Sequence, residues 1–221
     1  IPEPPREGTS SRSLAKFLTA LRNEPFRNLL VATAVWHFAL FVGAPFCVPY
    51  MMGELGFESD FILATLLVYA VPAAGTLLTL PLWGKLSDRV RPGLLMSVCC
   101  LFWAFIPLFY HHAHPGDALL MLAGAWVIAG VFPAGYAVVR PLLTRRLSGP
   151  DKTMPSALLL MVASLGSIVG SGVGTLIVRT HPVTDAFAVS FAARLAAAFV
   201  VTLLLLYAPM VKKWRAAKAA G

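Results

Sequence analysis

Few residues of this sequence could do chemistry in an apolar setting, and the first is His37. It is the tenth residue of a stretch, 28–53, that contains no Asp, Glu, Lys or Arg. A histidine can gain or lose a proton near neutral pH, and a titratable group deep in an apolar helix commonly marks a ligand or proton path. Helical spacing places Phe41 on the same face. We therefore predict that His37 and Phe41 are ligand contacts. The alternative is a neutral histidine hydrogen-bonded to a neighbouring helix.

Two aromatic residues of another uncharged stretch, 118–139, are further candidates for ligand contact. Trp126 and Tyr136 each combine a large apolar surface with one polar atom. Their alternative role is packing between helices. Arg194 interrupts a further apolar stretch, 186–211, near one end. Its long side chain is expected to reach back to the polar boundary.

The remaining reactive side chains indicate neither a metal site, a cofactor site nor an enzyme. His111, His112 and His114 lie together but have only Asp117 as a nearby acid, and a His-rich tract alone is weak evidence for a metal. The sequence contains no Gly-rich phosphate loop and no nucleophile elbow. Three cysteines, expected to be free thiols that pack as small apolar side chains, lie inside apolar stretches: Cys47, Cys99 and Cys100.

The elements that position these residues are six apolar stretches of 22–26 residues. A membrane helix needs about 20 mostly apolar residues, so each stretch predicts one transmembrane helix. The chain is 58% hydrophobic and only 13% charged, with a mean hydropathy of +0.76. A soluble domain carries roughly 25% charged residues, so the composition excludes a soluble enzyme. The six ranges are 28–53, 61–84, 92–116, 118–139, 153–178 and 186–211.

The distribution of Lys and Arg predicts the orientation of these helices. Sixteen of the eighteen basic residues lie in the N-terminal segment, in the second and fourth connections and in the C-terminal tail. The positive-inside rule then places both termini in the cytoplasm. The net charge of +8 is therefore a topology signal with contact to anionic lipid, and we expect no nucleic-acid partner.

The domain organisation expected from these patterns has three parts. Residues 1–27 form a cytoplasmic linker followed by a surface helix, 28–211 form the six-helix bundle, and 212–221 form a basic cytoplasmic tail. The first three helices and the last three begin at near-constant offsets, so the bundle is expected to contain a 3+3 inverted repeat.

A charged motif stands between the second and third helices, running from Gly84 to Pro92 with the sequence GKLSDRVRP. Gly84 would permit a close backbone approach, and Asp88 could cap the N-terminus of the next helix. Arg89 and Arg91 could pair with lipid phosphates or with a partner carboxylate. The simplest alternative is a short, capped, positive-inside loop.

The order G-x-L-S-D-R-x-x-R in this motif resembles the loop signature of the major facilitator superfamily. The family form usually has Gly where this chain has Arg91. This departure resembles the more degenerate copy of the signature, which lies in the C-terminal half of these transporters. Residues 23–27, NEPFR, resemble the end of the central cytoplasmic loop of these transporters. Residues 165–174, LGSIVGSGVG, resemble their Gly-rich eleventh helix. Helical spacing puts Gly166, Gly170 and Gly174 on one face, where a neighbouring helix could pack closely.

The resemblance implies an all-α membrane protein that forms the C-terminal six-helix half of a secondary transporter. It implies alternating access, a small-molecule substrate, a second six-helix half as partner, and location in a bacterial inner (plasma) membrane. The first and fourth helices of each half line the substrate cavity in this family, which would place His37, Phe41, Trp126 and Tyr136 there. Two alternatives are a six-helix membrane subunit with a structural role in a larger complex and a half-size transporter that dimerises.

Overall fold

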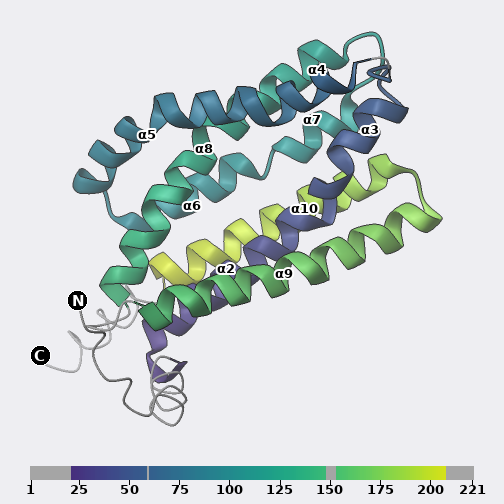
Figure 1. The fold of residues 1–221 in the computed structure, drawn as a ribbon. Helices are drawn as coiled ribbons and strands as arrows, with labels where there is room; N and C mark the ends of the chain where they lie inside the picture. Colours follow the sequence, from purple (N-terminus) through teal and green to yellow (C-terminus); the bar gives the residue numbers. More distant parts are fainter. Residues whose placement is uncertain (1–20, 59, 148–152, 208–221) are drawn as a thin grey trace, which may run out of the picture.

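The computed structural model describes residues 21–58, 60–147 and 153–207. Within these ranges all regular structure is helical, and six helices are long and apolar enough to cross a membrane (Figure 1). The six-helix prediction is thus confirmed. Residues 1–20 and the tail, 212–221, lie outside the described residues, as does the end, 208–211, of the sixth predicted span. The six helices are Glu24–Gly53, Phe61–Arg89, Pro92–His112, Ala118–Leu147, Pro155–Thr180 and Val183–Tyr207.

Several of these spans consist of consecutive helical pieces. The first joins α2 (Glu24–Gly43) through a 3₁₀ turn (Ala44–Phe46) to α3 (Cys47–Gly53). The second joins α4 (Phe61–Thr65) through a π turn (Leu66–Ala70) to α5 (Val71–Arg89). The other elements are α6 (Pro92–Trp103), α7 (Ile106–His112), α8 (Ala118–Leu147), α9 (Thr153–Thr180), α10 (Val183–Thr202) and a π turn (Leu203–Tyr207).

Proline explains the two breaks that matter for the site. Pro45 lies in the 3₁₀ turn after α2, and Pro107 lies in the first turn of α7, just after the break between α6 and α7. Proline has no backbone N–H and its ring crowds the carbonyl four residues earlier, so a helix bends or breaks there. The carbonyl that loses its partner at the second break is that of Trp103.

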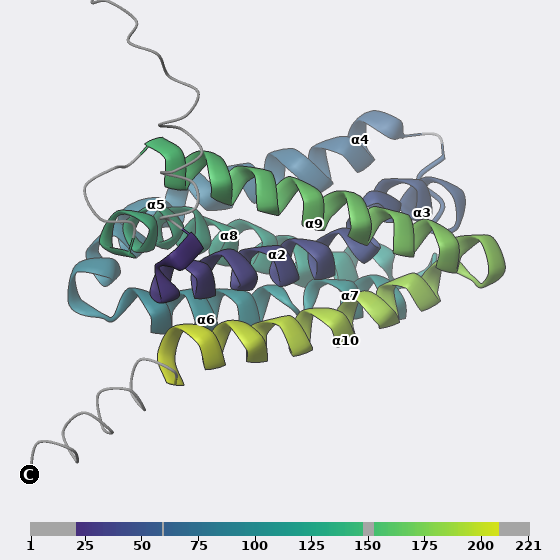
Figure 2. The same ribbon diagram turned by 90° about the horizontal axis from the view of Figure 1, so that it is seen from below.

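The packing of the six spans is symmetric under a shift of three helices. The first span packs chiefly against α9 and α10, while the fourth span, α8, packs chiefly against α5, α6 and α7. When each span is replaced by the one three positions away in the chain, the first becomes the fourth, the fifth becomes the second and the sixth becomes the third. The two sets of contacts then exchange. Figures 1 and 2 show the two resulting groups, α2 with α9 and α10, and α8 with α4 to α7. This exchange is what a 3+3 inverted repeat requires.

Three glycines of α9, Gly166, Gly170 and Gly174, lie directly against the backbone of α2. A Cβ at Gly166 would lie 2.6 Å from the Ala34 oxygen, and one at Gly170 would collide with the Phe38 oxygen. A Cβ at Gly174 would collide in the same way with the Val42 oxygen. In the other group a Cβ at Gly75 would lie 2.9 Å from Gly130 Cα. Both helix pairs therefore use glycine to bring backbones into contact.

Several boundaries differ from the sequence prediction, and the largest difference is at the fourth helix, which runs to Leu147 rather than ending at residue 139. The second helix continues from Gly84 to Arg89, because loss of hydrophobicity marks the edge of the apolar layer rather than the end of the helix. The third helix ends at His112 instead of residue 116, since Pro115 and Gly116 favour a turn.

Candidate functional site

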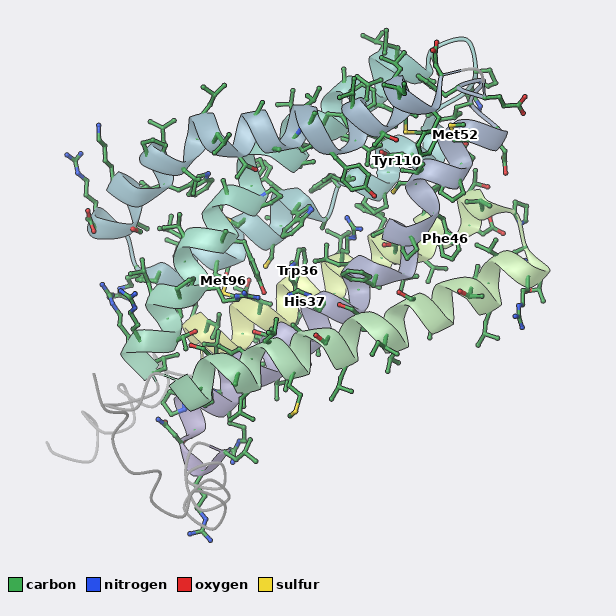
Figure 3. The ribbon with its side chains drawn as sticks, viewed as in Figure 1. Trp36, His37, Phe46, Met52, Met96 and Tyr110 are labelled. Carbon is green, nitrogen blue, oxygen red and sulfur yellow. The ribbon has the colours of Figure 1, made fainter. Side chains whose placement is uncertain are left out.

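The centre of the bundle holds a pair of rings from the first and fourth spans. The His37 ring of α2 meets the Tyr136 ring of α8 edge-to-face, with 6.2 Å between the ring centroids. Phe41 lies one turn further along α2, half-buried against the same core. Figure 3 shows Trp36 and His37 near the middle of the helices, with Phe46, Tyr110 and Met52 toward one end. The structure thus brings His37 and Tyr136 together from the two helices that the repeat relates.

The guanidinium group of Arg140 lies over the ring of Tyr136. The guanidinium carbon of Arg140 lies 5.8 Å from the Tyr136 ring centroid, in cation–π geometry. Arg140 follows the fourth apolar stretch, 118–139, and is one of the sixteen basic residues that the charge distribution assigned to the cytoplasmic side. The structure instead places it beside the central aromatic residues. The i, i+4 spacing of Tyr136 and Arg140 on one helix was the signal that could have found it.

Two tryptophans extend this group of rings. The Trp103 ring contacts Tyr136 at a centroid distance of 5.8 Å, and Trp36 lies 5.7 Å from Trp103. Both Trp36 and Tyr136 are buried, and neither the Trp36 indole N–H nor the Tyr136 hydroxyl has a hydrogen-bond partner among the described residues. We call the set Trp36, His37, Trp103, Tyr136 and Arg140 the central cluster.

Trp126 does not belong to the central cluster. It is buried in a second core with Tyr110, Ile106 and Phe187. It precedes Tyr136 by ten residues on α8, or about 15 Å along the helix axis. The structure therefore separates Trp126 from the other predicted contact residues.

Arg194 does not reach the boundary of the apolar layer, and the expectation that it does is wrong. Its side chain is 3% exposed and lies between α10, α2 and α6. Its Nη2 donates to the Leu40 oxygen at 3.0 Å, and its Nη1 donates to the Trp103 oxygen at 3.4 Å. One turn earlier on α10, the Ser190 hydroxyl donates to the Ala39 oxygen at 3.1 Å.

The acceptors of these hydrogen bonds lie at the helix breaks. Pro107 cannot donate to the Trp103 carbonyl, so that carbonyl has no partner from its own helix four residues on. The Leu40 carbonyl belongs to the last turn of α2, just before the 3₁₀ turn. The Leu40 carbonyl also accepts from the Ala44 backbone N–H, so it is the Trp103 carbonyl that depends on Arg194, in an apolar region where an unpaired carbonyl is costly.

The charged motif is helical rather than a loop over most of its length. Asp88 and Arg89 lie in the last turn of α5, and Arg91 precedes the first residue of α6. Asp88 does not cap α6, because the residue at the cap position is Arg91 and it makes no side-chain capping bond. A Cβ at Gly84 would meet no atom within 4 Å among the described residues, so the expected close approach is not made there.

The histidines near the other end of the bundle have local roles. His111 Nδ1 lies 2.9 Å from the Thr184 oxygen, and the His111 and His112 rings meet edge-to-face. The described residues contain no group of three or more His, Cys, Asp or Glu side chains placed to hold a metal ion.

Comparisons with known proteins agree with this architecture. A sequence model described as Major Facilitator Superfamily matches residues 29–221, which include the central cluster, the charged motif and the glycines of α9. Comparison with curated protein sequences gave no match. Members of the matched superfamily are transporters. The chain is therefore a multi-pass integral membrane protein of the Major Facilitator Superfamily.

Proposed function

We propose that this chain forms one six-helix half of a secondary active transporter that moves a small solute by alternating access. The central cluster and the neighbouring Phe41 supply the solute contacts, with His37, Phe41 and Tyr136 as the first of them. The observation that carries this proposal is the approach of His37 to Tyr136 at a centroid distance of 6.2 Å. These residues come from the two helices that the repeat relates, and transporters built from inverted repeats hold their substrate at the repeat interface.

We further propose that solute moves without covalent chemistry or a cofactor. In alternating access the two halves rock about the site, so that it opens to each side of the membrane in turn. The second half is another six-helix bundle, from the same longer chain, from a separate membrane subunit or from a second copy. The exposed apolar side chains of α5 fit a surface covered by lipid or by such a bundle, since Leu78 is 78% exposed.

The proposed orientation places both termini in the cytoplasm, in a bacterial inner membrane, with the three-part organisation of 1–27, 28–211 and 212–221. The distribution of charge along the described helices supports it. Arg89, Arg145 and Arg146 lie at the ends of α5 and α8, at one end of the bundle in Figure 1. The opposite connection after α3 carries Glu54 and Asp60. Cytoplasmic loops are the ones enriched in Lys and Arg.

The charged motif is proposed to bias the inward–outward equilibrium by contacting the second half. Asp88 and Arg89 are exposed, and neither makes an ion pair or side-chain hydrogen bond with the described residues. Their charges are therefore available to a neighbouring bundle.

An uptake comparison tests the proposal. Cells producing the wild-type protein and cells producing His37→Ala/Tyr136→Phe are given a defined mixture of labelled small solutes, at matched protein abundance in the membrane. We expect at least one solute to be accumulated or expelled with the wild type and not with the double variant. The control is Phe199→Leu, at a side chain of α10 that is 64% exposed, and it should retain transport.

Equal solute levels in all strains would contradict the proposed transport site. A structural subunit, the main alternative, predicts this result together with co-purification of a partner complex.

A further inference from the structure

The apolar interior of the described bundle is positively charged. Away from the helix ends, the six spans carry Arg140 and Arg194, and no Asp or Glu of the described residues lies at that depth. A charge is costly to bury without a counterion, even where the protein supplies hydrogen bonds. The two arginines at this depth therefore have no acidic counterion among the described residues.

Neither arginine has a carboxylate partner among the described residues. Arg140 contacts the face of the Tyr136 ring, and Arg194 bonds to two main-chain oxygens. Arg140 is also only partly buried. A negatively charged ligand that reaches Tyr136 would meet it directly.

The unpartnered polar atoms around these arginines are mostly hydrogen-bond donors. In the described residues the buried atoms without a partner include Trp36 Nε1, Tyr136 Oη, His37 Nε2 and Arg194 Nε. Indole and guanidinium nitrogens can only donate, and a phenol hydroxyl or an imidazole can donate. Buried polar groups in native proteins nearly always have partners, so a set of unpaired donors calls for a ligand rich in acceptors.

These atoms belong to one continuous group. The Arg140 guanidinium lies over Tyr136, the Tyr136 ring contacts both His37 and Trp103, and Trp103 contacts Trp36. The Trp103 carbonyl in turn accepts from Arg194. Four helices, α2, α6, α8 and α10, thus direct donors and positive charge toward the same part of the bundle.

We infer that the solute bound at the central cluster is a small organic anion carrying a carboxylate or phosphate group. Arg140 provides the charged contact, and the Tyr136 hydroxyl and the His37 imidazole donate hydrogen bonds to the anionic oxygens. The Trp36 and Trp103 rings border the site. This inference rests on the proposed transport function and names the class of its substrate.

Tryptophan fluorescence provides a direct test, because Trp36 and Trp103 are part of the cluster. The full chain, purified in detergent, is titrated with acetate, benzoate, succinate and inorganic phosphate, and in parallel with the neutral analogues acetamide, benzamide and succinamide. We expect a saturable change with at least one anion and none with its neutral analogue. Hydrogen bonds to charged groups are strong, so Arg140→Gln should weaken that binding by about tenfold or more.

Two matched variants sharpen the result. Tyr136→Phe removes only the hydroxyl and should weaken anion binding while the protein keeps its melting temperature. Arg145→Gln removes an exposed arginine from the same helix and should leave the binding unchanged.

The inference is overturned if no anion in the series gives a saturable change, if neutral analogues bind as well, or if Arg140→Gln binds like the wild type. Its failure is distinguishable from failure of the proposed function. If His37→Ala/Tyr136→Phe abolishes uptake of a solute but no anion binds, the site transports a neutral or cationic solute. If anions bind but no solute moves, only the transport proposal fails.

Discussion

Arg194 on α10 donates a hydrogen bond to the main-chain oxygen of Trp103, and that oxygen lacks a helical partner because Pro107 stands four residues later. A charged side chain in the apolar interior is thus matched to a gap in the hydrogen bonding of another helix. The same guanidinium also bonds to Leu40 at the end of α2.

This relationship predicts non-additive mutational effects. Arg194→Met should destabilise the protein, because leaving a buried carbonyl unpaired costs about 1–3 kcal/mol. Pro107→Ala restores a backbone N–H that can pair with the Trp103 carbonyl, so Arg194→Met should cost less in that background, by about 1 kcal/mol. Thermal unfolding of the wild type, both single variants and the double variant in detergent measures the coupling. Arg179→Met, at an exposed arginine, is the control, and strictly additive effects would refute the pairing.

The glycine contacts of α9 predict a strong positional contrast. Gly170→Ala places a methyl group against the Phe38 oxygen and should destabilise the protein by about 1–3 kcal/mol or prevent its assembly. Gly172→Ala meets no atom within 4 Å among the described residues and should be neutral, or stabilising by up to about 1 kcal/mol. The melting temperatures of the two variants, in otherwise identical protein, provide the comparison. Equal effects would mean that α9 does not lie against α2 at this register.

For His37, the pH–rate profile of transport separates its possible roles. Glutamine keeps much of the volume and hydrogen-bonding capacity of histidine but does not titrate. If His37 is a solute contact beside Tyr136 and Arg140, His37→Gln should raise KM and leave the shape of the profile unchanged. A flattened profile at unchanged KM would instead assign proton coupling to His37. Wild-type KM and profile together would exclude both roles.

The charged motif should affect transport without affecting the fold. Asp88→Asn and Arg89→Ala alter exposed side chains at the end of α5. Coupling between conformations is typically worth about 1–3 kcal/mol, so the transport rate should change about 5- to 150-fold. Initial uptake rates are measured together with membrane insertion and melting temperature. Unchanged rates in both variants would leave the motif as a topology signal.

The orientation can be checked with two exposed positions at opposite ends of the bundle. Asp60→Cys should react with a membrane-impermeant thiol reagent in intact cells, and Lys85→Cys should react only after permeabilisation. The wild type is the control for labelling of the native cysteines, of which Cys99 and Cys100 are buried and Cys47 is half-buried. Labelling of Lys85→Cys in intact cells would reverse the proposed topology.

The helices were predictable from the sequence, but many of their contacts were not. Runs of apolar residues predict the six spans directly, because whether a helix can cross an apolar layer depends on its length and hydropathy alone. The spacing of Gly166, Gly170 and Gly174 likewise indicated a face for close packing, although not which helix would cover it. The end of the uncharged stretch at Gly84 marked the edge of the apolar layer, whereas the helix continues to Arg89.

The positions of the arginines depended on partners far away in the sequence. Arg194 lies close to one end of its apolar stretch, so its position along the helix favoured an outward-reaching side chain. Its burial follows from hydrogen bonds to the Leu40 and Trp103 carbonyls, which lie next to Arg194 only once three helices have packed. The pairing of His37 with Tyr136 depends in the same way on the crossing of α2 and α8.

The seam between α2 and α9 has a mechanical consequence. Because backbone meets backbone at Gly166, Gly170 and Gly174, little of a relative displacement of the two helices can be absorbed there by side-chain rotamers. Tilting of α9 is therefore transmitted to the helix that carries His37. The outer surface of α9 exposes Ile168 and Leu176, where acyl chains would lie. A change in bilayer thickness, which tilts helices through hydrophobic mismatch, would thus displace His37 at the centre of the bundle.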